Sequence, residues 1–189
     1  MASELPQIIG IVGPIRAGKT TATKYLVEKY GYVSASNSDI LRRILEGMNI
    51  PPVRANLASL GDSIFKVLGN DIIARYRLDN LHLGRIIIDG IRYPEELVRY
   101  SQVPSFKLLG ITADPLVRYE RTLESAEELK DPDISKVKFD SLSLSRSELN
   151  VPELVSIADE TISNVEGVDA FKMRIDQVLN KWASVAVQK

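Results

Sequence analysis

The segment from Gly13 to Thr20, Gly-Pro-Ile-Arg-Ala-Gly-Lys-Thr, has the residue types and the spacing of a phosphate-binding loop. It follows an apolar run and precedes a helical pattern, which is the context that the pattern G-x-x-x-x-G-K-[ST] requires. Its two glycines allow successive backbone N–H groups to face one concavity, and the helix adds the positive end of its dipole. The segment therefore predicts a site for the phosphates of a nucleotide.

Individual positions of this loop have expected tasks. Lys19 is expected to act in catalysis by binding the β- and γ-phosphates of ATP, and the Thr20 hydroxyl is expected to bind Mg²⁺. Asn164, which follows the last apolar run, either borders the adenine or ends a strand. The predicted nucleotide-binding residues are Gly13, Pro14, Ile15, Arg16, Ala17, Gly18, Lys19, Thr20, Thr21 and Asn164.

Two acidic residues and an arginine follow other apolar runs. Asp89 closes the run Ile86-Ile87-Ile88 and is predicted to hold the water shell of Mg²⁺. Arg92 lies three residues later and is predicted to act in catalysis by clamping a phosphate; the alternative is a turn with a surface arginine. Asp39 either caps the helix that follows it or serves as a catalytic or acceptor-binding carboxylate.

Three further arginines flank a polar stretch, Ser125–Asp140. Arg118 and Arg121 lie on one face of a predicted helix, and Arg146 lies beyond the stretch. Arginines beside a lid neutralise the charge of a transferring phosphoryl group, so all three are predicted to be catalytic. A solvated helix face is the alternative for the first two, and the polar stretch is either a lid or a solvated loop.

These residues require a scaffold in which the ends of several strands meet. Five apolar runs of strand length alternate with helical patterns, at Ile8–Val12, Tyr32–Ala35, Arg85–Asp89, Phe106–Thr112 and Glu160–Ser163. Continuous apolar runs are typical of a parallel sheet with helices on both faces, and such doubly wound α/β sheets bind ligands at the carboxyl ends of their strands. Trp182 is expected in the core on a long C-terminal helix, whereas His82 is expected in a loop without a catalytic role.

The composition of the chain excludes several classes of protein. The chain has 189 residues, 24 basic and 25 acidic residues and no cysteine. A near-neutral chain is not expected to coat nucleic acid, and a chain without cysteine has no disulfide framework. The sequence has no signal-peptide layout and no apolar run of membrane-spanning length, so we expect a cytoplasmic protein without a membrane partner. We also expect a single domain over residues 1–189 that is a monomer or a weak homo-oligomer.

Taken together, these features resemble the P-loop nucleoside monophosphate kinase superfamily over nearly the whole chain. The segments that resemble dephospho-CoA kinase are Asp39-Ile40-Leu41-Arg42, the Asp114–Arg121 helix and Ala158–Asn164. The segments that resemble deoxynucleoside monophosphate kinases and archaeal nucleotide kinase-like proteins are Asp89–Glu96 and Arg54-x-x-Leu57-x-x-Leu60-Gly61. The resemblance implies a three-layer, five-stranded parallel sheet of the P-loop kinase type, a helical acceptor-binding region at about 39–82 and a lid at about 122–146.

The resemblance also implies an activity, which is ATP- and Mg²⁺-dependent phosphoryl transfer to a nucleotide or nucleotide-like acceptor. The acceptor is either dephospho-CoA, for which the acid matching Asp39 is the proposed base, or a (deoxy)nucleoside monophosphate. One departure favours another class of function, because no arginine occurs from Leu123 to Ser145 and lids of monophosphate kinases are richer in arginine. An ATP-binding regulator without acceptor turnover, and a simple ATPase, therefore remain alternatives.

Overall fold

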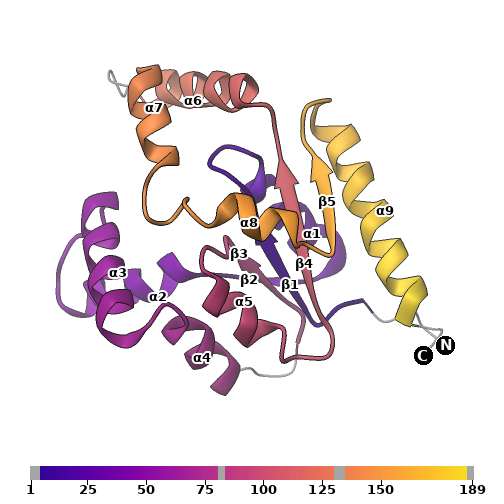
Figure 1. Cartoon of the computed structure of the whole chain (residues 1–189), viewed down its shortest axis with the longest axis horizontal. Helices are drawn as coiled ribbons and strands as arrows, with labels where there is room; N and C mark the ends of the chain where they lie inside the picture. Colours follow the sequence, from indigo (N-terminus) through magenta and orange to yellow (C-terminus); the bar gives the residue numbers. More distant parts are fainter. Residues whose placement is uncertain (1–4, 81–83, 130–134, 187–189) are drawn as a thin grey trace.

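The computed structural model describes residues 5–80, 84–129 and 135–186, which form a parallel sheet with helices on both faces (Figure 1). The strands of this part of the chain are β1 (Ile8–Val12), β2 (Val33–Ser36), β3 (Ile86–Asp89), β4 (Phe106–Thr112) and β5 (Glu160–Ser163). Their order is β2-β3-β1-β4-β5, and every neighbouring pair is parallel. This confirms the expected five-stranded doubly wound sheet, in which β2 and β3 each begin one residue later than the sequence predicted.

Helices connect the strands and cover the sheet. They are α1 (Lys19–Tyr30), α2 (Asn37–Gly47), α3 (Arg54–Leu68), α4 (Ile72–Asp79), α5 (Pro94–Tyr100), α6 (Pro115–Leu129), α7 (Lys136–Ser143), α8 (Val151–Ser156) and α9 (Val168–Ala186). In Figure 1, α2, α3 and α4 form one group and α6 and α7 form another. None of the helices in the described ranges combines the length and the apolar character that crossing a membrane requires.

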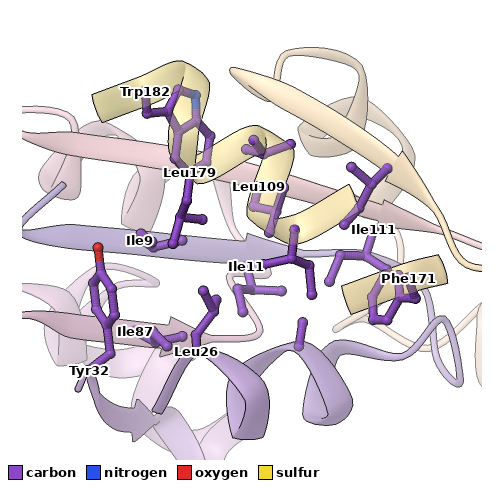
Figure 2. Close-up of a cluster of buried hydrophobic side chains, with 14 of the residues drawn as sticks. Ile9, Ile11, Leu26, Tyr32, Ile87, Leu109, Ile111, Phe171, Leu179 and Trp182 are labelled. Atoms are coloured by element: carbon purple, nitrogen blue, oxygen red, sulfur yellow. The ribbon is translucent and has the colours of Figure 1, made fainter. Parts of the chain in front are cut away.

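The central strand, β1, shows why the strands appear in the sequence as continuous apolar runs. All five residues of β1 are buried, and their side chains alternate between the two faces of the sheet. Ile9 and Ile11 pack in a core with α1 and α9, where Figure 2 shows Trp182 beside Leu179. Ile8 and Val12 pack in a second core with α5 and α8. Trp182 is 7% exposed, so its expected place in the core is confirmed.

The strand register brings the chemically important segments to one edge of the sheet. Asp89 at the end of β3 is paired with Ile11 of β1 and with Ser36 of β2. The phosphate-binding loop, residues 13–20, starts directly after β1, and α2 starts directly after β2. The loop, Asp89 and the beginning of α2 therefore meet at the carboxyl end of the sheet.

Candidate functional site

Close packing explains the two glycines of the phosphate-binding loop. Gly18 has a φ of 109°, in the left-handed region, and a Cβ added there would lie 2.1 Å from Nδ2 of Asn164. At Gly13 glycine is required by lack of space alone, because an added Cβ would lie 2.2 Å from the carbonyl oxygen of Ile111 in β4. Arg16, between them, also has a positive φ, of 62°. The loop is therefore held against the ends of β4 and β5.

Side chains from several elements hold the carbonyl groups of this loop. Lys19 donates to the carbonyls of Gly13 (2.7 Å) and Pro14 (2.9 Å), Arg118 to Ile15 (3.3 Å), Arg121 to Arg16 (3.3 Å) and Asn164 to Ala17 (2.9 Å). The C=O and N–H of one peptide unit point in opposite directions, so the N–H groups of Ile15, Arg16 and Gly18 turn away from these donors. N–H groups gathered in this way form an anion-binding concavity.

The positions of Arg118, Arg121 and Asn164 refine the roles expected from the sequence. Both arginines donate to loop carbonyls, and Arg121 also donates to the carbonyl of Asn164 at 2.9 Å. Asn164 is 6% exposed and its backbone N–H donates to Thr112, so it both ends β5 and fixes the loop. All three residues brace the loop; Arg121 also lines one of the two cavities beside it, whereas Arg118 and Asn164 line neither.

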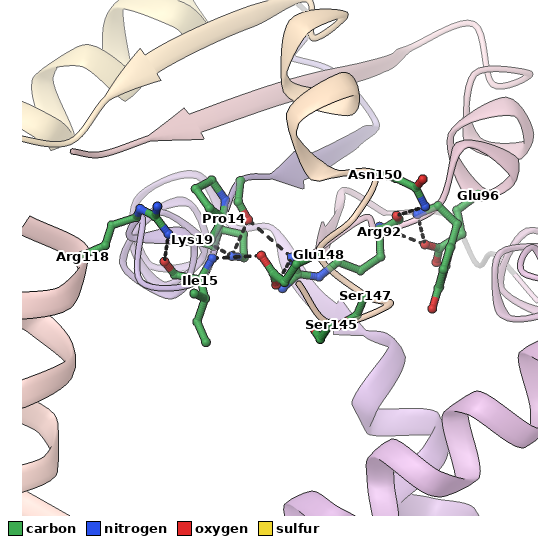
Figure 3. Close-up of polar contacts among 12 residues, drawn as sticks. Pro14, Ile15, Lys19, Arg92, Glu96, Arg118, Ser145, Ser147, Glu148 and Asn150 are labelled. Carbon is green, nitrogen blue, oxygen red and sulfur yellow. Dashed lines mark hydrogen bonds and ion pairs between the residues drawn. The ribbon is translucent and has the colours of Figure 1, made fainter. Parts of the chain in front are cut away.

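Arg92 lies against the phosphate-binding loop together with a residue that the sequence did not single out (Figure 3). Its Nη1 is 2.6 Å from Oε1 of Glu148 and 3.5 Å from the carbonyl oxygen of Gly13. The other carboxylate oxygen of Glu148 accepts a hydrogen bond of 3.1 Å from the N–H of Ile15. Sequence reasoning had no signal for Glu148, because it lies 133 residues from its loop partner.

A buried carboxylate fixes the turn that carries Arg92. Glu96 is fully buried and accepts hydrogen bonds from the backbone N–H groups of Arg92 (3.0 Å) and Tyr93 (3.2 Å). Its second oxygen accepts from Nδ2 of Asn37, the first residue of α2, at 2.6 Å. Burial raises the pKa of Glu96, and these donors counteract that rise. Glu96 therefore sets the distance between the turn after β3 and the start of α2.

Two cavities of about 570 Å³ each open beside the loop. Both are lined by Lys19, Thr20, Arg54, Arg92, Ser145 and Ser147. The first, which we call the loop-side cavity, is also lined by Ile15, Arg16, Gly18, Thr21, Arg121, Glu124 and Glu148. The second, the helix-side cavity, is also lined by Ser36, Asn37, Ser38, Leu41, Leu57, Ala58, Gly61, Asp62, Phe65, Asp89, Gly90, Tyr93 and Arg146. The two cavities meet at Lys19.

Arg146 and Asp39 lie away from the loop-side cavity. Arg146 donates to Oδ1 of Asn70 at 3.0 Å and stands 5.6 Å from the centre of the Tyr93 ring, so it belongs to the helix-side cavity. Asp39 accepts from the N–H of Ser36 at 2.8 Å and completes the capping box of α2. It lines a separate cavity of about 400 Å³ and neither of the other two. The structure thus supports the cap interpretation of Asp39.

The groups that would hold Mg²⁺ lie in the helix-side cavity. Asp89 and Thr20 both line it next to Lys19. Burial raises the pKa of Asp89, whereas Lys19 and Arg92 lower it. Among the described residues, no group of three or more His, Cys, Asp and Glu side chains is placed to hold a metal. A carboxylate and a hydroxyl beside a phosphate site fit Mg²⁺, which binds through few protein ligands and substrate phosphates.

Part of the expected lid and one histidine lie beyond what the structure describes. His82 and residues 130–134 are outside the described residues. Of the rest of the lid, α6 packs on α7, with the Arg118 guanidinium 5.6 Å from the centre of the Phe139 ring. Burial lowers the pKa of Arg118. This contact joins the helix that braces the loop to the helix that precedes Glu148.

The comparisons with known proteins agree with this architecture. The sequence matches a family described as an AAA domain over residues 9–140. The UPF0200 protein of Sulfurisphaera tokodaii is 23% identical over 178 residues, which cover 94% of this chain and 98% of that protein. The UPF0200 protein MJ1399 of Methanocaldococcus jannaschii is 24% identical over 179 residues, which cover 92% and 89%.

Solved structures of kinases share the fold. Shikimate kinase from Acinetobacter baumannii, in complex with shikimate, superimposes with a TM-score of 0.60 at 17% identity, over 95% of each chain. Dephospho-CoA kinase from Campylobacter jejuni gives a TM-score of 0.53 at 12% identity, over 93% of this chain and 97% of that one. At these identities the likeness shows the P-loop kinase fold.

The Lys19 amine is expected to titrate with a pKa of about 8, lowered from 10.5 mainly by burial and next by the charge of Arg92. The folded state then binds fewer protons than the unfolded state between these two values. The free energy of unfolding therefore rises with pH across that window.

An NMR titration of ¹³Cε-labelled lysines, with Lys19→Met to assign the signal, measures the pKa. Arg92→Ala should move it upward, and a wild-type value above about 10 would contradict this environment.

Proposed function

The chain belongs to the AAA domain family and has the fold of the P-loop kinases, and from this premise we propose that it transfers the γ-phosphoryl group of ATP to a nucleotide-like acceptor. The observation that carries the proposal is the meeting of two cavities of about 570 Å³ at Lys19, Thr20 and Arg92. Phosphoryl transfer needs a donor and an acceptor whose reacting oxygens approach in line at one cationic centre. The two cavities supply one space for each.

The phosphates of ATP would bind the backbone N–H groups of the loop and the Lys19 amine, with the nucleotide in the loop-side cavity. Thr20 would bind Mg²⁺ directly and Asp89 would bind it through water. When bound, the ion neutralises charge on the phosphates. The contact of Arg92 with the carbonyl of Gly13 supports a role for its guanidinium in neutralising charge on the transferring group. Arg118 and Arg121 contribute by keeping the loop in shape.

The helix-side cavity favours an acceptor that carries a phosphate. Arg54, Arg92 and Arg146 line it, and its apolar side chains include the edge-to-face pair of Phe65 and Tyr93. Guanidinium groups bind phosphate, and aromatic rings pack against a flat base. A monophosphate acceptor is already an anionic nucleophile and needs no base. We therefore propose a (deoxy)nucleoside monophosphate in preference to the hydroxyl acceptor dephospho-CoA.

A second candidate function is regulation by ATP binding without phosphoryl transfer. The observation that favours it is the absence of arginine from Leu123 to Ser145. Lysine neutralises phosphate as a point charge and lacks the planar fork of arginine. Such a regulator would bind ATP through the same loop and leave every acceptor unchanged.

Purified protein with Mg²⁺ and ATP is expected to release ADP in a coupled assay only when a suitable nucleoside monophosphate is added. Lys19→Ala should lower kcat/KM by at least about 100-fold, because the amine contacts the transferring group. Lys24→Ala, an exposed lysine on the same helix, is the matched control and should stay within about twofold.

Tight ATP binding without transfer to ribo- and deoxyribonucleoside monophosphates, dephospho-CoA or nucleosides would support the regulator. Acceptor-independent ADP release would indicate an ATPase.

Asp39→Asn distinguishes a capping role from a catalytic one. An asparagine side chain can still accept from the N–H of Ser36, so we expect turnover of the preferred monophosphate within about threefold of wild type. A general base would show a loss of about 10²- to 10⁴-fold instead. Such a loss at unchanged thermal stability would place Asp39 in the chemistry and favour a hydroxyl acceptor.

A further inference from the structure

The carboxylate of Glu148 binds two groups that could otherwise bind a phosphate. One oxygen accepts from the N–H of Ile15 in the phosphate-binding loop, and the other is paired with the guanidinium of Arg92. The side chain is only 8% exposed, and Figure 3 shows it between the loop and Arg92. Burial lowers the pKa of Lys19 and of Arg118, and the negative charge of Glu148 counteracts both changes, so Glu148 lies among cations from two helices and from the turn after β3.

A phosphate and this carboxylate exclude one another. One N–H group donates one good hydrogen bond, so Ile15 serves either Glu148 or a phosphate oxygen. A polyphosphate beside an ionised carboxylate would also experience like-charge repulsion in a half-buried space. A phosphate oxygen can therefore accept from the Ile15 N–H only after Glu148 has moved.

The same short segment contacts the other half of the site. Arg146, two residues before Glu148, donates to Asn70, and its guanidinium lies 5.6 Å from the centre of the Tyr93 ring at the helix-side cavity. Asn150, two residues after it, donates to the carbonyl of Arg92 at 3.3 Å. Residues 146–150 therefore contact both Arg92 and the helix-side cavity.

We propose that Glu148 is an internal competitor for phosphate, which ATP displaces from the loop when it binds. The exchange frees the Arg92 guanidinium from its carboxylate partner and makes it available to the acceptor phosphate. ATP therefore binds before the acceptor. This inference rests on the phosphate-binding part of the proposed function and does not depend on phosphoryl transfer.

Isothermal titration calorimetry with ATP, and separately with inorganic tripolyphosphate, tests the proposal on the full chain. Glu148→Gln removes the competing charge, so we expect its affinity for both ligands to be about tenfold higher than that of wild type, or about 1.4 kcal/mol. Glu148→Asp keeps the charge but is too short to span Ile15 and Arg92, so its affinity should lie between the two. Unchanged or weaker binding by Glu148→Gln, with wild-type thermal stability, would overturn the proposal.

Two further variants separate competition from a general effect of charge. Glu124→Gln removes a carboxylate that lines the same cavity and is exposed, so its gain in affinity should be clearly smaller. An equal gain would overturn the proposal. Lys19→Ala combined with Glu148→Gln should lose the gain if both ligands use the loop. Wild-type ATP binding without a gain in Glu148→Gln refutes the competitor and leaves the kinase proposal standing, whereas no binding by any variant refutes both.

Discussion

The hydrogen bonds that hold the carbonyl groups of residues 13–17 are the constraint on which the rest of the site depends. Their donors come from α1, from α6 and from the residue after β5, so segments far apart in the sequence fix this short loop. Because the carbonyls are occupied, the N–H groups on the other side of these peptide units are directed away from the donors, and such groups are suited to an anion. The close approach of β4 and β5 to Gly13 and Gly18 leaves no room for other residues.

Charge is balanced within this site, and the balance connects its two halves. The charge of Arg92 lowers the pKa of Lys19, whereas the charges of Asp89 and Glu148 act on that pKa in the opposite direction. Glu96 holds Arg92 through backbone N–H groups and links it to the start of α2. A ligand that displaces Glu148 would therefore change the partners of Arg92, and in the function proposed above this couples binding of the donor to binding of the acceptor.

Local patterns predicted the sheet, the phosphate-binding loop and the core position of Trp182, because these depend on residue type and short-range spacing. They left Asp39 open between cap and base, since both need an acid at the start of a helix. The hydrogen bond with Ser36, which the sequence pattern could not show, establishes the cap. They missed Glu148 and the carbonyl contacts of Arg118 and Arg121, which join residues more than 100 positions apart. Such contacts depend on how the chain returns from α6 and α7 to the sheet.

The most direct test of this account is a crystal structure of the protein with Mg²⁺ and the non-hydrolysable analogue β,γ-imido-ATP. The account predicts phosphate oxygens within hydrogen-bonding distance of the loop N–H groups and of the Lys19 amine. It also predicts that the carboxylate of Glu148 has left Ile15. An analogue bound elsewhere, with Glu148 still on Ile15 and Arg92, would contradict it.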